Sequence, residues 1–158
     1  MKLELKKLSV LLLAKHIKLV TVESCTGGWI GKFITDAAGS SKWYEAGFIT
    51  YSNQAKQRLV DVSEQLLEEY GAVSIQVAEA MAQGALSYFP SAISVSVTGV
   101  AGPGGGSEEK PVGMVCIACC YQGISTSKRF DFSGDRDQVR RQTVERAIQL
   151  VLEVLDGS

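Results

Sequence analysis

The chain has 158 residues, 46% of them hydrophobic and 21% charged, an ordinary globular composition that excludes disordered, fibrous and collagen-like chains. With 16 Lys and Arg against 17 Asp and Glu, the net charge is −1, so no overall field draws the chain to nucleic acid or to an anionic membrane. The length predicts one domain over residues 1–158, and no apolar run approaches the roughly 20 residues of a membrane span.

The first half of the chain alternates between helical and strand-like patterns. Apolar residues at helical spacing predict an amphipathic helix over 3–16. A β-branched run at 18–22 then leads through a tight turn into a helix over 29–36. A second strand is expected over 46–51, followed by three helices: from an N-cap at Asn53 to Val60, over 63–70, and from an N-cap at Ser74 to Phe89.

The second half is richer in strands. Residues 92–98 alternate with period two and end in a glycine-rich loop, and residues 112–121 and 124–132 flank a hairpin turn at Gln122-Gly123. Asp135 opens a long terminal helix. The order α-β-α-β-α-α-α-β-β-β-α predicts a three-layer α/β/α fold with a mixed, partly parallel sheet covered by helices on both faces.

The cysteines and the N-terminal segment predict a reduced, cytoplasmic protein. Three of the four cysteines, Cys116, Cys119 and Cys120, crowd into one strand-like run, which disfavours a disulfide framework. Residues 1–14 imitate an export signal, but the apolar run is short, Glu4 interrupts the basic stretch and no small-residue cleavage site follows.

His16 is the only histidine, and it lies at the end of the first helix, remote in sequence from every polar motif. A structural or solvated role is expected for it. A Ser-His-Asp triad would have to recruit this residue, and histidine-rich metal ligation is excluded. We therefore expect neither a metal nor a cofactor.

The turn over residues 23–28, Glu-Ser-Cys-Thr-Gly-Gly, carries the densest group of reactive side chains. It lies at the carboxyl end of a predicted strand, where open α/β sheets bind ligands. Backbone N–H groups at the start of the following helix lack intrahelical partners and can hold an oxyanion or a phosphate. The alternative is a capped helix whose glycines only permit close packing.

A second group, Tyr51-Ser-Asn-Gln-Ala-Lys56, also lies where a strand meets a helix. A lysine has a pKa of about 10.4 in water, but burial or a cationic neighbour lowers it by several units. Such a lysine can act as the base that a chain with one histidine lacks. The alternative is a solvated Lys56 on an exposed helical face.

Two further segments complete the set. The loop over 98–106, Thr-Gly-Val-Ala-Gly-Pro-Gly-Gly-Gly, lacks the ending of a Walker loop and precedes a strand, so ATP and dinucleotide sites are disfavoured. It is typical of a loop that lies against a ligand, with a flexible linker as the alternative. The last helix offers Arg136, Arg140 and Arg141 as phosphate ligands, and the choice among them stays open against ordinary surface ion pairs.

In this order the four segments resemble the C-terminal domain of the CinA (competence and damage-inducible) family, and more narrowly its nicotinamide mononucleotide deamidases. The resemblance runs from about residue 8 to 155 and rests on residues 23–28, 50–56, 98–113 and positions between 134 and 144. It implies a metal-independent amidohydrolase that converts nicotinamide mononucleotide to nicotinic acid mononucleotide and ammonia in pyridine nucleotide salvage. It also implies a homodimer.

The residues and the resemblance together predict a serine amidohydrolase. Ser24 attacks the carboxamide carbon, Lys56 is the general base and later the acid, and Tyr51 orients the lysine or relays its proton. Cys25 is the rival nucleophile on chemical grounds, but the resemblance favours the serine.

The same hypothesis assigns the contacts with substrate. The oxyanion is bound by the N–H groups of Thr26, Gly27 and Gly28. The phosphate and ribose are bound by Arg140, Thr98 and Gly102, and Glu23 faces the positive ring or the ribose. The expected partner is a small nucleotide substrate, with no nucleic acid and no membrane. The competing hypothesis is a non-catalytic nucleotide-binding or regulatory module of the same fold, which needs no activated lysine.

Overall fold

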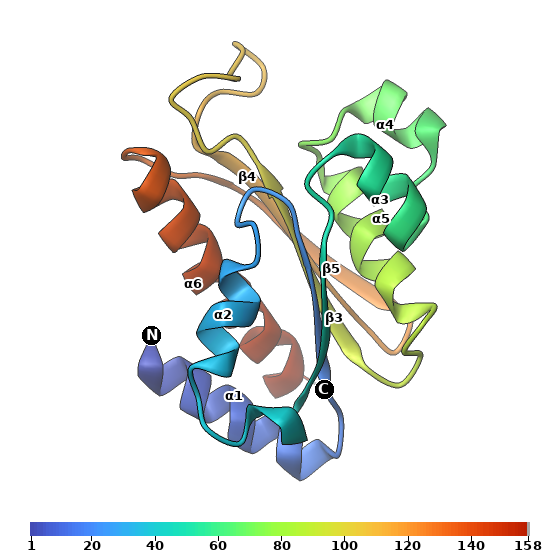
Figure 1. Cartoon of the computed structure of the whole chain (residues 1–158), viewed down its shortest axis with the longest axis vertical. Coiled ribbons are helices and arrows are strands. Elements are labelled where there is room, and N and C mark those ends of the chain that lie inside the picture. The colour runs from blue at the N-terminus through green and yellow to red at the C-terminus, as the bar shows by residue number, and fades with distance from the viewer. Residues whose placement is uncertain (158) are drawn as a thin grey trace.

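The computed structural model describes residues 1–157 and contains one five-stranded sheet with helices on both faces (Figure 1). The predicted fold class is confirmed. In chain order the elements are α1 (Lys2–Lys15), β1 (Leu19–Glu23), α2 (Trp29–Thr35), the 3-10 turn η1 (Ser40–Lys42), β2 (Tyr44–Ile49), α3 (Asn53–Val60), α4 (Glu64–Tyr70), α5 (Ile75–Leu86), β3 (Ile93–Gly99), β4 (Met114–Tyr121), β5 (Ile124–Asp131) and α6 (Arg136–Asp156).

The strands lie in the order β2-β1-β3-β4-β5. β1 is parallel to both neighbours, so Val20 pairs with Ala46 on one side and with Ser94 on the other. β3, β4 and β5 are antiparallel. Gln122 and Gly123, which join β4 to β5, both have positive φ, as a tight two-residue hairpin turn requires.

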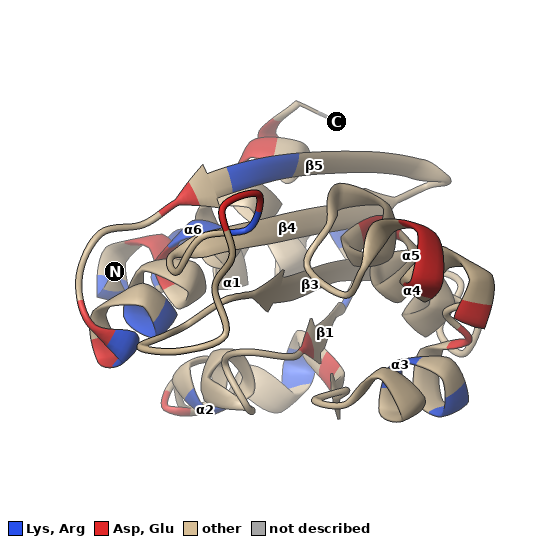
Figure 2. Cartoon of the chain, turned by 90° about the horizontal axis from the view of Figure 1, so that it is seen from above, with Lys and Arg blue, Asp and Glu red and all other residues tan. Residues whose placement is uncertain are grey.

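Helices α1, α2 and α6 lie on one face of the sheet and α3, α4 and α5 on the other (Figures 1 and 2). β1 is buried throughout, which explains its continuous apolar and β-branched run, whereas β2 at the sheet edge alternates between exposed and half-buried residues. The larger core lies under α1 and α6, where Leu8, Leu12 and Ile148 are fully buried. No helix within residues 1–157 is long and apolar enough to cross a membrane.

Several predicted boundaries were wrong: β2, expected over 46–51, spans Tyr44–Ile49, and β4, expected from 112, starts at Met114. The N-cap of α3 is Ser52, whose hydroxyl accepts a hydrogen bond from the Ala55 N–H, and not Asn53, which is the first helical residue. Ser and Asn are almost equally favourable N-cap residues, so the sequence alone does not tell which of the neighbours Ser52 and Asn53 caps the helix. Helix α5 ends at Leu86, three residues before the predicted Phe89.

The topology gathers three loops at one edge of the sheet. Parallel strands β1, β2 and β3 end there, at Glu23, Ile49 and Gly99. β1 lies between the other two, and the connections on its two sides cross opposite faces of the sheet, through α2 and through α3 to α5. This is the switch point at which α/β sheets bind ligands.

Candidate active site

Ser24 and Lys56 meet at this edge. The Lys56 Nζ lies 3.0 Å from the Ser24 Oγ and also donates to the carbonyl oxygens of Thr50, at 2.8 Å, and Tyr51, at 3.2 Å. A neutral amine has two N–H bonds and one lone pair. With the two carbonyls taking the N–H bonds, the lone pair is left to accept the Ser24 hydroxyl proton. The geometry is that of a nucleophile paired with its base.

Backbone pairing holds both side chains in place. The Ser24 N–H donates to the Val97 carbonyl at 3.1 Å and the Thr50 N–H to the Glu23 carbonyl at 2.8 Å, so the loops continue the parallel ladders beyond the strand ends. The buried residues of α3 are Lys56 and Val60, one helical turn apart. The lysine therefore lies on the face of α3 that packs inward, and not on a solvated face.

Lys56 is only 1% exposed and is among the largest fully buried side chains in residues 1–157. Burial disfavours the charged ammonium and lowers the pKa of Lys56 to about 8. A substantial fraction of the amine is then neutral near pH 7 to 8, as a general base requires.

Glu23 is 2% exposed, and its carboxylate caps the start of α2. It accepts hydrogen bonds from the Thr26 hydroxyl at 2.6 Å and from the N–H groups of Gly28, Ile30 and Gly31 at 2.9–3.2 Å. Its oxygens are thus turned into the fold, whereas the sequence predicted that they face the ring or ribose of a substrate. Negative charge at a helix N-terminus is favourable, so Glu23 stabilises the turn that carries Ser24.

A cavity of about 240 Å³ opens over the serine and the lysine. Of the residues predicted from the sequence, it brings together Ser24, Tyr51, Lys56 and Thr98. It is also lined by Gly99 and Ala101 of the 98–106 loop, which the sequence predicted to lie against a ligand, and by three residues for which no role in the site was predicted: Asn53, Ala72 and Val73. Asn53 belongs to the Tyr51–Lys56 segment, so the sequence could have indicated its place in the site. Ala72 and Val73, which precede α5, lie in no motif that could have done so.

Arg136, the first residue of α6, also lines this cavity. Its guanidinium donates to the Gly102 carbonyl at 2.8 Å and lies 3.4 Å from the Tyr51 hydroxyl, which makes it the link between the glycine-rich loop and Tyr51. The Tyr51 phenol therefore contacts an arginine, and it is the Tyr51 main chain that contacts Lys56.

The other predicted site residues lie beside this cavity. Thr26, Gly27, Gly28 and Arg140 line a neighbouring, open hollow of about 480 Å³ together with Trp29 and Lys32. The Gly27 N–H already donates to the Ser24 carbonyl at 3.1 Å, and the Gly28 N–H to the Glu23 carboxylate. Within residues 1–157 no hydrogen bond from the N–H of Cys25 or of Thr26 to another residue is found.

Cys25 is 6% exposed, and burial raises the pKa of its thiol to about 12. A thiol with so high a pKa is almost entirely protonated at neutral pH and is a poor nucleophile. No group of three or more His, Cys, Asp or Glu side chains suited to a metal ion is found in the described part of the chain.

A serine hydrogen-bonded to a lysine is one of the arrangements by which hydrolytic enzymes activate a serine, and the switch point of the sheet is where open α/β folds bind ligands. The chain belongs to the CinA C-terminal domain family, whose sequence profile matches residues 3–155.

Relatives and solved structures agree with this assignment. The chain is 52% identical over 137 residues to the nicotinamide-nucleotide amidohydrolase PncC of Escherichia coli K12, covering 86% of this chain and 83% of that protein. It is 49% identical over 142 residues to a CinA-like protein of Citrifermentans bemidjiense, covering 90% of this chain but 34% of that protein. The crystal structure of a CinA superfamily protein from Escherichia coli superposes with a TM-score of 0.92 at 37% identity, over 96% of this chain and 88% of that one.

Proposed function

We propose that this protein hydrolyses the carboxamide of nicotinamide mononucleotide to give nicotinic acid mononucleotide and ammonia. It is an amidase, like the relatives of 50–52% sequence identity that are named nicotinamide-nucleotide amidohydrolases. The observation that carries the chemical step is the 3.0 Å contact between the buried Lys56 Nζ and the Ser24 Oγ.

In the first half-reaction the Ser24 Oγ attacks the carboxamide carbon while its proton passes to the neutral Lys56 amine. The C–N bond of the tetrahedral intermediate then breaks, and the Lys56 ammonium returns the proton to the leaving nitrogen, which departs as ammonia. The product is a nicotinoyl ester on Ser24.

In the second half-reaction water attacks that ester and Lys56 takes the proton from the water. Collapse of the second intermediate returns the proton to Ser24 and releases the carboxylic acid. One substrate and one water thus give one acid and one ammonia. Because Lys56 accepts and returns the proton in each half-reaction, the mechanism needs neither a metal nor a cofactor.

The basic end of the cavity suits the phosphate. Arg136 lines the cavity, and its contacts with Gly102 and Tyr51 leave other guanidinium N–H donors for a phosphate. We therefore assign the phosphate to Arg136 in preference to Arg140, whose guanidinium is engaged by carbonyl groups of the 23–28 turn. Thr98 and Asn53 also line the cavity and are candidates for contacts with the ribose and the carboxamide.

The remaining expectations belong to this proposal: a cytoplasmic enzyme of pyridine nucleotide salvage that acts as a homodimer and binds neither nucleic acid nor membrane. The outer side of α1 exposes Leu3, Val10 and Leu13 and is the proposed dimer face. Light scattering of the wild type and of the Val10→Glu variant tests this.

The decisive experiment is ammonia release from purified protein with nicotinamide mononucleotide, in the presence and absence of a chelator. Turnover is expected in both samples and is expected to be lost in Ser24→Ala and in Lys56→Met. Turnover that needs added zinc or magnesium, or that survives in both variants, would remove the serine–lysine mechanism.

A further inference from the structure

Arg140 donates two hydrogen bonds to the turn that carries the nucleophile: Nε to the Cys25 carbonyl and Nη2 to the Thr26 carbonyl, both at 3.0 Å. We propose that Arg140 is a positioning residue, which fixes these peptide groups so that the backbone N–H groups of Cys25 and Thr26 form the oxyanion-binding site. This inference rests on the proposed function and adds to it the donors and the residue that orients them.

The first step follows from the planarity of the peptide bond. In a trans peptide the C=O and the N–H of the next residue point in opposite directions. The Cys25 carbonyl points at the Arg140 guanidinium, so the Thr26 N–H, in the same peptide group, points away from it. The arginine therefore sets the direction of a donor that it does not touch.

The second step extends this to Cys25. Arg140 also holds the Thr26 carbonyl, whose peptide group includes the Gly27 N–H, and that N–H donates to the Ser24 carbonyl at 3.1 Å. The Ser24 carbonyl shares a peptide group with the Cys25 N–H, which consequently points away from Gly27. One guanidinium thus fixes three successive peptide groups.

The third step concerns availability. Buried backbone N–H groups are nearly always hydrogen-bonded. Cys25 and Thr26 are 6% and 0% exposed, yet within residues 1–157 no hydrogen bond from either N–H to another residue is found, whereas Gly27 and Gly28 are both engaged. The N–H of the residue after a nucleophile is a usual oxyanion donor, and Cys25 lines the cavity beside Ser24.

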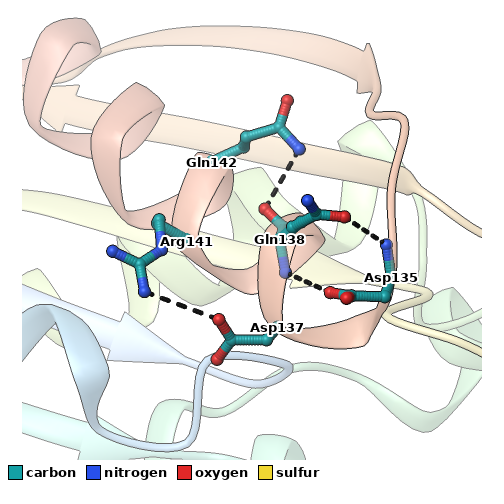
Figure 3. Close-up of polar contacts among 5 residues, drawn as sticks. All are labelled: Asp135, Asp137, Gln138, Arg141 and Gln142. Carbon is teal, nitrogen blue, oxygen red and sulfur yellow. Dashed lines mark hydrogen bonds and ion pairs between the residues drawn. The ribbon is translucent and has the colours of Figure 1, made fainter.

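The surroundings hold Arg140 in this role. Its guanidinium lies over Trp29, 5.3 Å from the ring centroid, and Arg140 lines the neighbouring hollow, together with Thr26, and not the serine cavity. Arg141 also lies over Trp29, at 5.6 Å from the ring centroid, but its guanidinium pairs with the Asp137 carboxylate, at 3.5 Å (Figure 3). Arg141 therefore offers a matched control on the same helix.

The test compares Arg140→Met, Arg140→Lys, Arg136→Met and Arg141→Met, with nicotinamide mononucleotide and with the nucleoside that lacks its phosphate. Arg140→Met is expected to lower kcat on the order of 10²-fold, equally for both substrates, with Arg140→Lys intermediate. Binding of the nucleotide to a Ser24→Ala background should be unchanged by Arg140→Met. Arg141→Met should stay within about twofold of wild type, and Arg136→Met should abolish the preference for the nucleotide.

The inference is overturned if both Arg140 variants keep kcat within about threefold of wild type, or if they weaken nucleotide binding and erase the preference for the phosphate. Arg140→Lys retains the charge and the stem over Trp29, so it serves as the test if Arg140→Met does not fold. A wild type without turnover, or a fully active Ser24→Ala, would instead refute the proposed function.

Discussion

Two neighbouring residues compete for the role of nucleophile, and their surroundings differ sharply. The Ser24 Oγ lies 3.0 Å from the Lys56 Nζ, whereas burial raises the pKa of the Cys25 thiol to about 12. We expect Ser24→Ala to lower kcat at least about 10³-fold without unfolding the protein, because the covalent step is lost. Cys25→Ala should cost about 1 kcal/mol of stability and leave most of the rate.

Ammonia release and urea unfolding of the two variants separate these effects. Wild-type enzyme treated with an alkylating reagent is the independent check. Stoichiometric inactivation at Cys25 that substrate prevents, together with an active Ser24→Ala, would make the protein a cysteine hydrolase.

The protonation of Lys56 sets the expected pH dependence. Only the neutral amine can accept the serine proton, and burial lowers the pKa of Lys56 to about 8. Below that pKa, kcat/KM should rise about tenfold per pH unit, and it should level off above about pH 8. A rate profile from pH 6 to 9.5 measures this, with Cys25→Ala as a control that keeps the same profile. A rate that falls between pH 6 and 8 would mean that the ammonium form is the active one.

At the same scale, Glu23 shows what a sequence conceals. The residue types predicted a polar site at residues 23–28, and Ser24, directly after β1, does lie beside Lys56 of α3, the proposed base. The buried direction of the Glu23 carboxylate, by contrast, depends on how β1 meets α2. Likewise Arg136 and Arg140 are one helical turn apart on α6, so periodicity places them on one face and cannot tell which one reaches the serine cavity.

At the scale of elements, the position of Lys56 depends on the packing of α3 against α5. Gly84 of α5 lies so close to the end of α3 that an added Cβ would be 1.7 Å from the Val60 carbonyl oxygen. In an isolated helix Gly84→Ala would gain about 1 kcal/mol. Here the overlap forces α3 to move, so we expect a net loss of about 2 kcal/mol or more, and a lower kcat because the lysine moves with α3.

Urea unfolding and ammonia release check both parts of this prediction. Gly104→Ala is the control, since a Cβ at Gly104 meets nothing within 4 Å. A Gly84→Ala variant that is more stable than wild type would show that helix propensity outweighs the contact with α3.

Elements with strong local signals were predicted well, and the reason is physical. Period-two and period-3.6 patterns report burial, and the Asp135 capping box, in which Gln138 is the return partner, fixes the start of α6 (Figure 3). The end of α5 was placed too late because Pro90 marks where a helix cannot continue, whereas the last helical residue is set by tertiary packing. The strand order β2-β1-β3 could not be predicted from hydrophobic patterns, because they do not show which strands are neighbours in the sheet. It follows only from the family resemblance or from the structure.

At the scale of the whole molecule, the site is assembled from segments that lie far apart in the sequence. Ser24, Lys56, Thr98 and Arg136 come from four different segments joined through one sheet. A ligand bound there contacts both helical layers, so its binding free energy opposes unfolding of the chain as a whole. We therefore expect the nucleotide to stabilise the entire protein in a single transition.

The Ser24→Ala variant, which binds without turnover, permits the measurement. Nicotinamide mononucleotide at about 100 times its Kd should add about 2.7 kcal/mol to the free energy of unfolding. For a chain of this length that raises Tm by roughly 5–10 °C. The Arg136→Met change in the same background should remove most of the shift at the same nucleotide concentration, because the phosphate contact is lost. Calorimetry decides the outcome: a melt that splits into two steps, of which the nucleotide moves only one, would show that the strands of the site do not unfold as one unit with the rest of the sheet.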